Sequence, residues 1–89
     1  MQGLNKKELE IIRSLAQYRI NSLNDYVKEQ EKALEYCNKQ LEHFPKSKIA
    51  KEHYYGVNAT LLRYLKEIAI LTDLRDKVIL MKEVLKNEK

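Results

Sequence analysis

The sequence predicts an all-α protein built as a long helical hairpin. Its single proline, Pro45, lies between two amphipathic stretches of about forty residues each, and proline breaks a helix interior because it lacks an N–H donor and clashes with the preceding turn. The chain is 44% apolar and 34% charged with only two glycines, a composition typical of long helices and coiled coils. In both stretches apolar residues recur at spacings of three and four, which indicates one continuous helical face in each.

The first helix is expected over residues 5–43. Asn5 is a favoured N-cap residue, and Glu8 three positions later can complete a capping box. The apolar stripe of this helix is predicted to contain Leu9, Ile12, Ala16, Leu23, Tyr26 or Val27, Leu34, Cys37, Leu41 and Phe44.

Two polar residues, Arg19 and Gln30, fall on this predicted stripe, and its register slips by one residue near Tyr26. We interpret Arg19 as packing its aliphatic stem while its charged head reaches solvent, and Gln30 as lying at the edge of the stripe. The alternative is that the two polar residues set the register of an oligomer, as polar residues in helical interfaces can.

A turn is expected at residues 44–47 and a second helix at 48–86, with Ser47 as a cap. Gly56 and Asn58 weaken this helix and mark a kink at 56–58 or a close helix crossing, because glycine in a helix interior costs roughly 1 kcal/mol relative to alanine. The apolar stripe, which we assign as the self-association face, contains Val57, Leu61, Tyr64, Ile68, Leu71, Leu74, Val78, Met81 and Leu85. A second apolar set, Leu62, Leu65, Ala69, Ile70, Ile79 and Leu80, makes this face wider than one neighbouring helix can cover.

The width of that face predicts a homodimer in which two hairpins form an antiparallel four-helix bundle. The alternative is a compact monomer of three or four shorter helices. In that case the Asn and Ser residues within 21–25, which favour caps over helix interiors, would break the first helix. In either case the 89 residues form one domain.

Apolar runs of only a few residues predict a soluble protein with no membrane partner, because a spanning helix needs about twenty apolar residues. The N-terminal residues do not have the pattern of a secretion signal. Cys37, the single cysteine, is expected to be a small buried packing residue and cannot form an internal disulfide. A cytoplasmic location is therefore predicted.

The net charge of +4 lies entirely in the second half of the chain, where residues near the predicted turn are basic. The start of a helix carries partial positive charge, so lysines there are mildly unfavourable unless an anion binds. We take five residues as candidate anion or nucleic-acid contacts: Lys46, Lys48, Lys51, Arg63 and Lys66. Two nearby rings, Tyr54 and Tyr55, are candidate contacts for a protein partner.

The sequence offers no recognisable catalytic, cofactor or metal site. Neither histidine completes a Glu-x-x-His pair, because Gln40 precedes His43 by three positions and Ala50 precedes His53. Simple hairpin geometry places His53 opposite about Lys39 and so does not bring it together with Cys37 in a tetrahedral metal site. No glycine-rich phosphate loop is present, and no serine or cysteine nucleophile has an evident histidine partner.

These observations favour a small non-enzymatic helical module for protein–protein interaction that binds itself and one further, unidentified protein. The excess of Lys over Arg, with abundant Ile, Asn and Tyr, is the composition of an AT-rich bacterial or bacteriophage genome. We therefore expect an accessory protein of a phage or mobile element that binds a host or phage protein. The alternative function is a small nucleic-acid-binding regulator that uses the basic hairpin tip.

Overall fold

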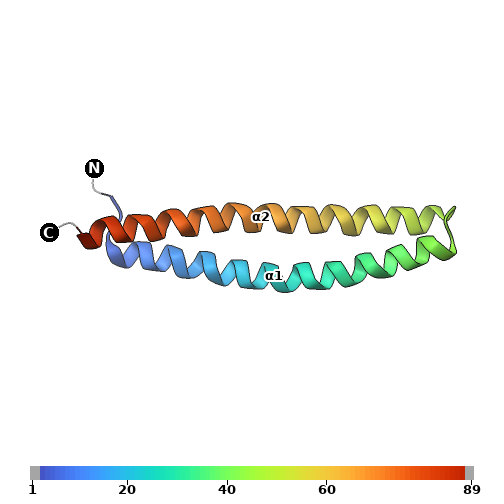
Figure 1. Cartoon of the computed structure of the whole chain (residues 1–89), viewed down its shortest axis with the longest axis horizontal. Coiled ribbons are helices and arrows are strands. Elements are labelled where there is room, and N and C mark those ends of the chain that lie inside the picture. Colours follow the sequence, from blue (N-terminus) through green and yellow to red (C-terminus); the bar gives the residue numbers. More distant parts are fainter. Residues whose placement is uncertain (1–2, 88–89) are drawn as a thin grey trace.

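The computed structural model, which describes residues 3–87, contains two long antiparallel helices joined by a short turn (Figure 1). Helix α1 spans Lys6–His43 and helix α2 spans Lys48–Asn87. The molecule measures 66 × 21 × 15 Å. The predicted all-helical hairpin is therefore confirmed.

Helix α1 begins with the predicted capping box. The backbone N–H of Glu8 donates to Asn5 Oδ1 at 2.8 Å, and the backbone N–H of Asn5 donates to Glu8 Oε1 at 3.0 Å. The first N–H groups of a helix have no carbonyl group of a preceding turn to donate to. The capping box gives two such N–H groups a hydrogen-bond acceptor.

The turn between the helices contains Pro45 and Lys46, and Ser47 caps α2. The backbone N–H of Ala50 donates to Ser47 Oγ at 3.2 Å, as the sequence predicted. Before the turn, the N–H of Phe44 still donates to the carbonyl of Gln40, so α1 ends with its last carbonyl groups partly paired.

Both helices are continuous over their whole length. Helix α1 passes through residues 21–25 without a break, so the alternative of three or four shorter helices is wrong. The propensity of Asn and Ser for caps is overcome here because the neighbouring Leu23 is fully buried against α2. Helix α2 likewise continues through Gly56 and Asn58.

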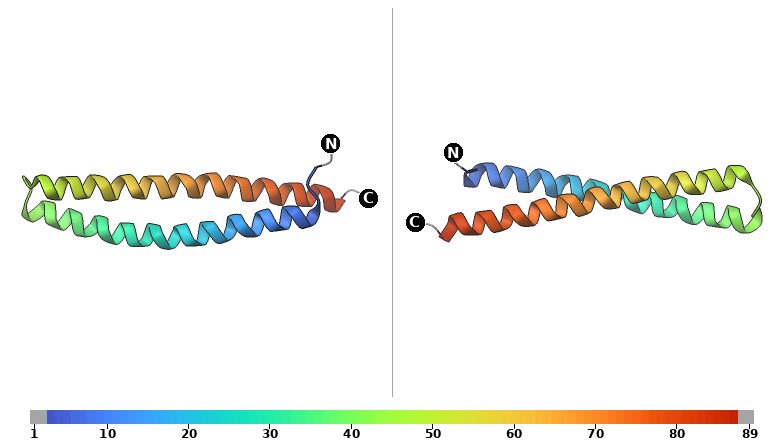
Figure 2. Two further views of the ribbon diagram at one scale, coloured as in Figure 1. Left: turned by 180° about the vertical axis from the view of Figure 1, so that it is seen from behind. Right: turned by 90° about the horizontal axis from the view of Figure 1, so that it is seen from above.

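The two helices pack as an antiparallel coiled coil and cross once when seen from above (Figure 2). The residues of α1 that face α2 keep a strict alternation of four and three: Leu9, Arg13, Ala16, Ile20, Leu23, Val27, Gln30, Leu34, Cys37 and Leu41. The most buried among them are Leu9, Leu23 and Cys37. A spacing that averages 3.5 residues keeps one face toward the partner over the full length.

The interface position between Ala16 and Leu23 belongs to Ile20 and not to Arg19. Ile20 is 5% exposed, whereas 48% of the Arg19 side chain is exposed. With Ile20 in place, the register slip near Tyr26 disappears, because Val27 follows Ile20 by seven residues. Gln30 is half-buried within the interface.

The interface stripe of α2 differs from the predicted one at two positions. Arg75 and Lys82 are half-buried there, whereas Leu74 and Met81 are 40% and 53% exposed. The remaining predicted residues are buried or half-buried: Val57, Leu61, Tyr64, Ile68, Leu71, Val78 and Leu85. Most of the stripe that the sequence analysis assigned to self-association is therefore used by the hairpin itself.

The described helices include no segment long and apolar enough to cross a membrane.

Candidate interaction surfaces

The hairpin has two broad faces, one on each side of the plane that contains both helices. A cross-helix ion pair identifies the first: Arg19 Nε donates to Glu67 Oε2 at 2.8 Å, which raises the pKa of Arg19 through the hydrogen bond and the charge of Glu67. Residues at helical spacing from this pair form what we call the Arg19 face. It comprises Ile12, Leu15, Arg19, Tyr26, Glu29, Ala33 and Tyr36 of α1 and Gly56, Thr60, Arg63, Glu67, Ile70, Leu74, Lys77 and Met81 of α2.

The Arg19 face is rich in exposed apolar side chains on both helices. Leu15 is 65% exposed, Ile70 60% and Met81 53%. Tyr26 contributes a ring on α1 that contacts Tyr64 of α2, with ring centroids 5.6 Å apart. Because both helices contribute, the apolar surface extends across the hairpin.

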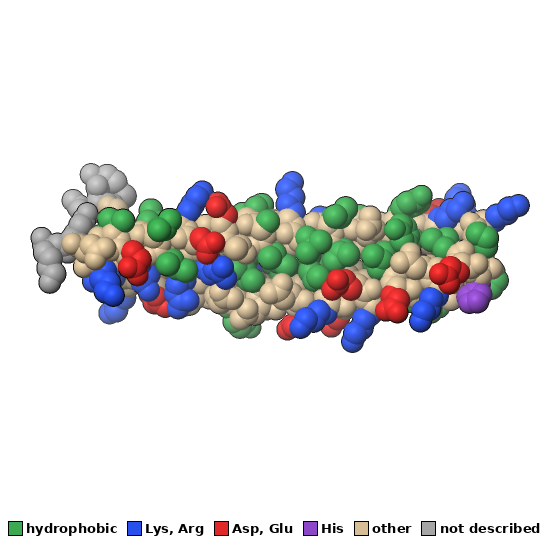
Figure 3. All heavy atoms as spheres, in the orientation of Figure 1, with side chains coloured by type: hydrophobic (Ala, Val, Ile, Leu, Met, Phe, Trp, Pro, Cys, Tyr) green, Lys and Arg blue, Asp and Glu red, His purple; other side chains and the backbone are tan. Residues whose placement is uncertain are grey.

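The second face, the Glu10 face, is polar on one helix and apolar on the other. It comprises Glu10, Gln17, Asn21, Lys28, Glu31 and Glu35 of α1 and Tyr55, Leu62, Leu65, Ala69 and Ile79 of α2. Figure 3 shows this pattern: hydrophobic side chains gather over the middle of α2, while acidic and basic side chains follow α1. A partner that covered this whole face would have to remove many charges from water, which is costly.

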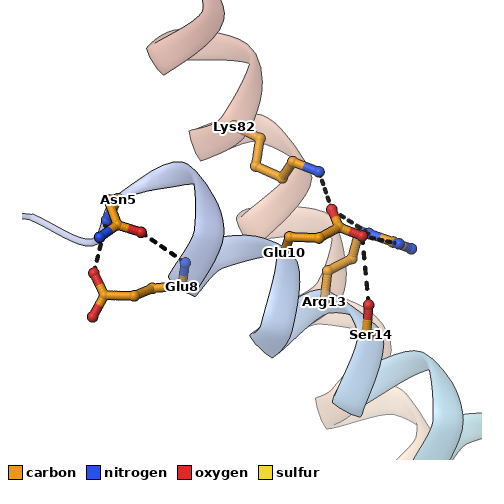
Figure 4. A network of polar contacts seen from close by, with 6 residues as sticks. All are labelled: Asn5, Glu8, Glu10, Arg13, Ser14 and Lys82. Atoms are coloured by element: carbon orange, nitrogen blue, oxygen red, sulfur yellow. Dashed lines mark hydrogen bonds and ion pairs between the residues drawn. The ribbon is translucent and has the colours of Figure 1, made fainter.

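Glu10 joins the two helices on this face (Figure 4). Its carboxylate accepts hydrogen bonds from Arg13 one turn later and from Lys82 of α2, and Ser14 Oγ donates to it at 3.4 Å. The hydrogen bonds from Arg13 and Lys82 lower the pKa of Glu10 from its ordinary value of 4.5 to about 2. Two turns beyond Glu10, Arg75 donates to Gln17 Oε1 at 2.8 Å. These α1 oxygens explain why α2 places Arg75 and Lys82 in the interface.

We expect Glu10→Gln to lower the free energy of unfolding at neutral pH and to have little effect in strong acid. Because folding lowers the pKa of Glu10, its stabilisation is complete above about pH 4.5 and is lost as the pH falls toward 2. Urea unfolding of both proteins between pH 7 and pH 2.5 measures the difference. Glu31→Gln is the control, since no ion pair of Glu31 is found among the described residues. A wild-type advantage that was as large at pH 2.5 as at pH 7 would contradict the assignment.

The predicted basic cluster is only partly brought together. Lys46, Lys48 and Lys51 are exposed at the turn and the start of α2, whose first turn contains no acidic residue. Arg63 lies fifteen residues beyond Lys48, or about 22 Å along the helix. Arg63 and Lys66 therefore belong to the middle of the hairpin and not to its tip.

The two tyrosines proposed as partner contacts have different environments. Tyr54 is half-buried and Tyr55 is 66% exposed, and their rings meet edge to face with centroids 5.8 Å apart. Tyr55 is therefore the one that offers free surface to a partner.

Cys37 is buried as predicted, but its neighbour was not predicted. His53 Nδ1 lies 3.4 Å from Cys37 Sγ, beside a pocket of about 230 Å³ that is also lined by Tyr36, Gln40 and Ser47. The prediction that His53 lies opposite Lys39 is therefore wrong by about two residues, because the register depends on the length of the turn. Within residues 3–87, no group of three or more His, Cys, Asp or Glu side chains is arranged to hold a metal ion.

The open end of the hairpin carries a second pocket, of about 320 Å³, whose lining is almost entirely apolar. Leu4, Leu80 and Val84 line it together with the buried Leu9. The sequence analysis missed this site because Leu4 precedes the first helix and Val84 lies outside both apolar sets of the second.

Comparison of the chain with protein-family models, with curated proteins and with solved structures found no match.

Proposed function

We propose that this chain is a non-enzymatic helical interaction module whose first partner is a second copy of itself, the two hairpins packing face to face as a four-helix bundle. The observation that carries the proposal is the single-layer shape of the hairpin. It is 15 Å thick, little more than one helix with its side chains. Each helix therefore touches only one other helix, although exposed apolar residues lie on both broad faces of α2.

The extent of the exposed apolar surface supports this proposal. Monomeric proteins rarely expose large contiguous apolar patches, and such patches mark interaction sites. The broad face of the hairpin, 66 by 21 Å, is larger than the roughly 800 Å² per partner of a standard stable interface. A four-helix bundle is the arrangement by which two such hairpins bury a common face.

Sedimentation equilibrium across a range of micromolar concentrations tests the proposal. We expect the mass of two chains, with monomer appearing on dilution. A mass of one chain at every concentration would rule out self-association, and helicity measured on the same samples would show whether the hairpin is folded.

The apolar strip of α2 on the Glu10 face supports a contact with a second, different protein. Tyr55, Leu62 and Ala69 recur every seven residues with Leu65 beside them, the spacing that docks one further amphipathic helix. Dimerisation through the Arg19 face would leave this strip open.

The basic tip supports a second candidate function, weak binding of nucleic acid. Three exposed lysines, Lys46, Lys48 and Lys51, lie at a helix start without an acidic neighbour in the first turn, where an anion is favoured.

We expect the triple variant Lys46→Ala, Lys48→Ala, Lys51→Ala to abolish any binding of DNA or RNA at low salt. Removal of each phosphate contact lowers the slope of log affinity against log salt by roughly one. Fluorescence anisotropy with labelled oligonucleotides at low and physiological salt measures it. Equal binding by the triple variant, or no binding by the wild type, would show that the tip is ordinary solvated surface.

A further inference from the structure

We propose that the Arg19 face is the dimer interface and that the second copy lies on it antiparallel, with α1 against α1 and α2 against α2. The inference rests on the proposed function, which claims only self-association, and it adds the face and the orientation. Three independent features of the described residues carry it.

The first feature is the difference between the two faces. On the Arg19 face both helices present exposed apolar residues, such as Leu15 on α1 and Ile70 on α2, and the charged pair Arg19–Glu67 is already internally compensated. On the Glu10 face the α1 half is polar along its whole length. A second copy therefore buries more apolar area and fewer charges on the Arg19 face.

The second feature is Gly56, which lies on the Arg19 face in the interior of α2. A Cβ at this position would meet nothing within 4 Å, so no contact inside the hairpin requires glycine there. Glycine in a helix interior costs about 1 kcal/mol relative to alanine. A close approach of another helix on this face gives the glycine a function.

The third feature is the order of large and small residues along the face. The half near the termini carries Ile70 and Leu74, and the half near the turn carries Gly56 and Thr60. An antiparallel copy places Leu74 against Gly56 and Ile70 against Thr60, so that a large residue meets a small one at both of these α2 pairs. A parallel copy would place the large residues together at one end and force the hairpins apart there.

The charges of the face fit the same symmetry axis. An antiparallel crossing of α2 on α2 that centres at residue 65 brings Arg63 to Glu67 of the second copy. On α1, an antiparallel crossing that centres at residue 24 likewise brings Arg19 to Glu29 of the second copy. Residues 24 and 65 lie at the same height in the hairpin, because Tyr26 and Tyr64 are in contact. One two-fold axis therefore satisfies both pairs.

Disulfide cross-linking tests the orientation. In a Cys37→Ser background, Thr60→Cys with Ile70→Cys places two thiols ten residues, or about 15 Å, apart in one chain, too far for an internal bridge. In the antiparallel dimer each thiol faces its counterpart on the second copy. We expect a covalent dimer on non-reducing electrophoresis after mild oxidation, and the same product from a mixture of the two single variants. Neither single variant alone should give it.

A second measurement tests the face without cysteines. Gly56→Leu should raise the dimer dissociation constant at least tenfold, because the side chain fills the space that the second copy occupies. Ala59→Leu, on the outer side of α2 three residues later, should leave it unchanged.

The outcomes separate this inference from the proposed function. If the wild type sediments as a dimer but the Thr60 and Ile70 cysteines give no covalent dimer, or if Gly56→Leu leaves the mass unchanged, the inference is overturned while self-association stands. A monomeric wild type overturns both.

Discussion

Replacing Leu23 by alanine is expected to lower the free energy of unfolding by about 2–5 kcal/mol, the range measured for leucine-to-alanine changes in protein cores. Leu23 is 0% exposed, near the middle of α1. With only two helices, few residues can move in to fill the space that the side chain leaves. Urea unfolding followed by circular dichroism at one fixed protein concentration measures the effect, since the stability of any self-associating protein depends on concentration.

Leu62→Ala is the matched control for this prediction. Leu62 is the same residue type in the same kind of helix, but it is 58% exposed and lies on the Glu10 face. We expect a change of no more than about 0.5 kcal/mol, as for surface substitutions in general. If Leu23→Ala and Leu62→Ala lowered the free energy of unfolding equally, burial between α1 and α2 would not determine the stability of the hairpin.

The sequence was sufficient to predict the hairpin because its signals are local. Pro45 cannot continue a helix, and Asn5 and Ser47 each supply an oxygen to N–H groups at a helix start. None of these effects depends on what the helices later pack against. The continuous apolar pattern of α1 also predicted an unbroken helix through residues 21–25. The preference of Asn and Ser for helix caps costs little free energy compared with what the burial of Leu23 contributes.

The exact phase of each interface stripe could not be predicted from single residues. Arg19 and Ile20 both lie within one step of Ala16 and Leu23, and a period of 3.6 admits either. If spacings of four and three residues had been required to alternate strictly from Leu9 onward, Ile20 would have been chosen. The same requirement would have placed Arg13 in the stripe.

The same difficulty in α2 has a different cause. Arg75 and Lys82 lie in the interface because oxygens of Gln17 and Glu10 on α1 accept their hydrogen bonds. That information is held by the other helix. A search of α2 alone therefore preferred the apolar Leu74 and Met81.

This difference matters for the candidate site, because Leu74 and Met81 lie on the exposed Arg19 face, whereas most of the stripe assigned with them lies between the two helices. The stripe first assigned to self-association mixes two surfaces, one that closes the hairpin and one that stays open. Charged substitutions in these two surfaces should therefore fail in different ways.

Leu71→Glu is expected to unfold the chain. Leu71 is half-buried between α1 and α2, and a carboxylate held there without a partner costs several kcal/mol. Loss of helicity by circular dichroism is the expected signal, and loss of the dimer follows from it.

Leu74→Glu, three residues later, should instead separate the dimer and leave the hairpin folded. Leu74 is 40% exposed on the Arg19 face, so in a single hairpin the new carboxylate reaches water. In the dimer it would be buried twice, once in each copy, opposite Gly56, which offers no charged partner. We expect full helicity with the sedimentation mass of one chain at concentrations where the wild type has the mass of two.

Leu62→Glu completes the comparison, because it introduces the same charge on the Glu10 face of the same helix. It should change neither helicity nor mass, since this face stays in water in the proposed dimer. If Leu62→Glu separated the dimer and Leu74→Glu did not, the second copy would have to lie on the Glu10 face, where Leu62, Leu65 and Ile79 would form the interface. The charges of α1 on that face make this the less favourable arrangement, because Glu31, Glu35 and Lys28 would have to leave water with it.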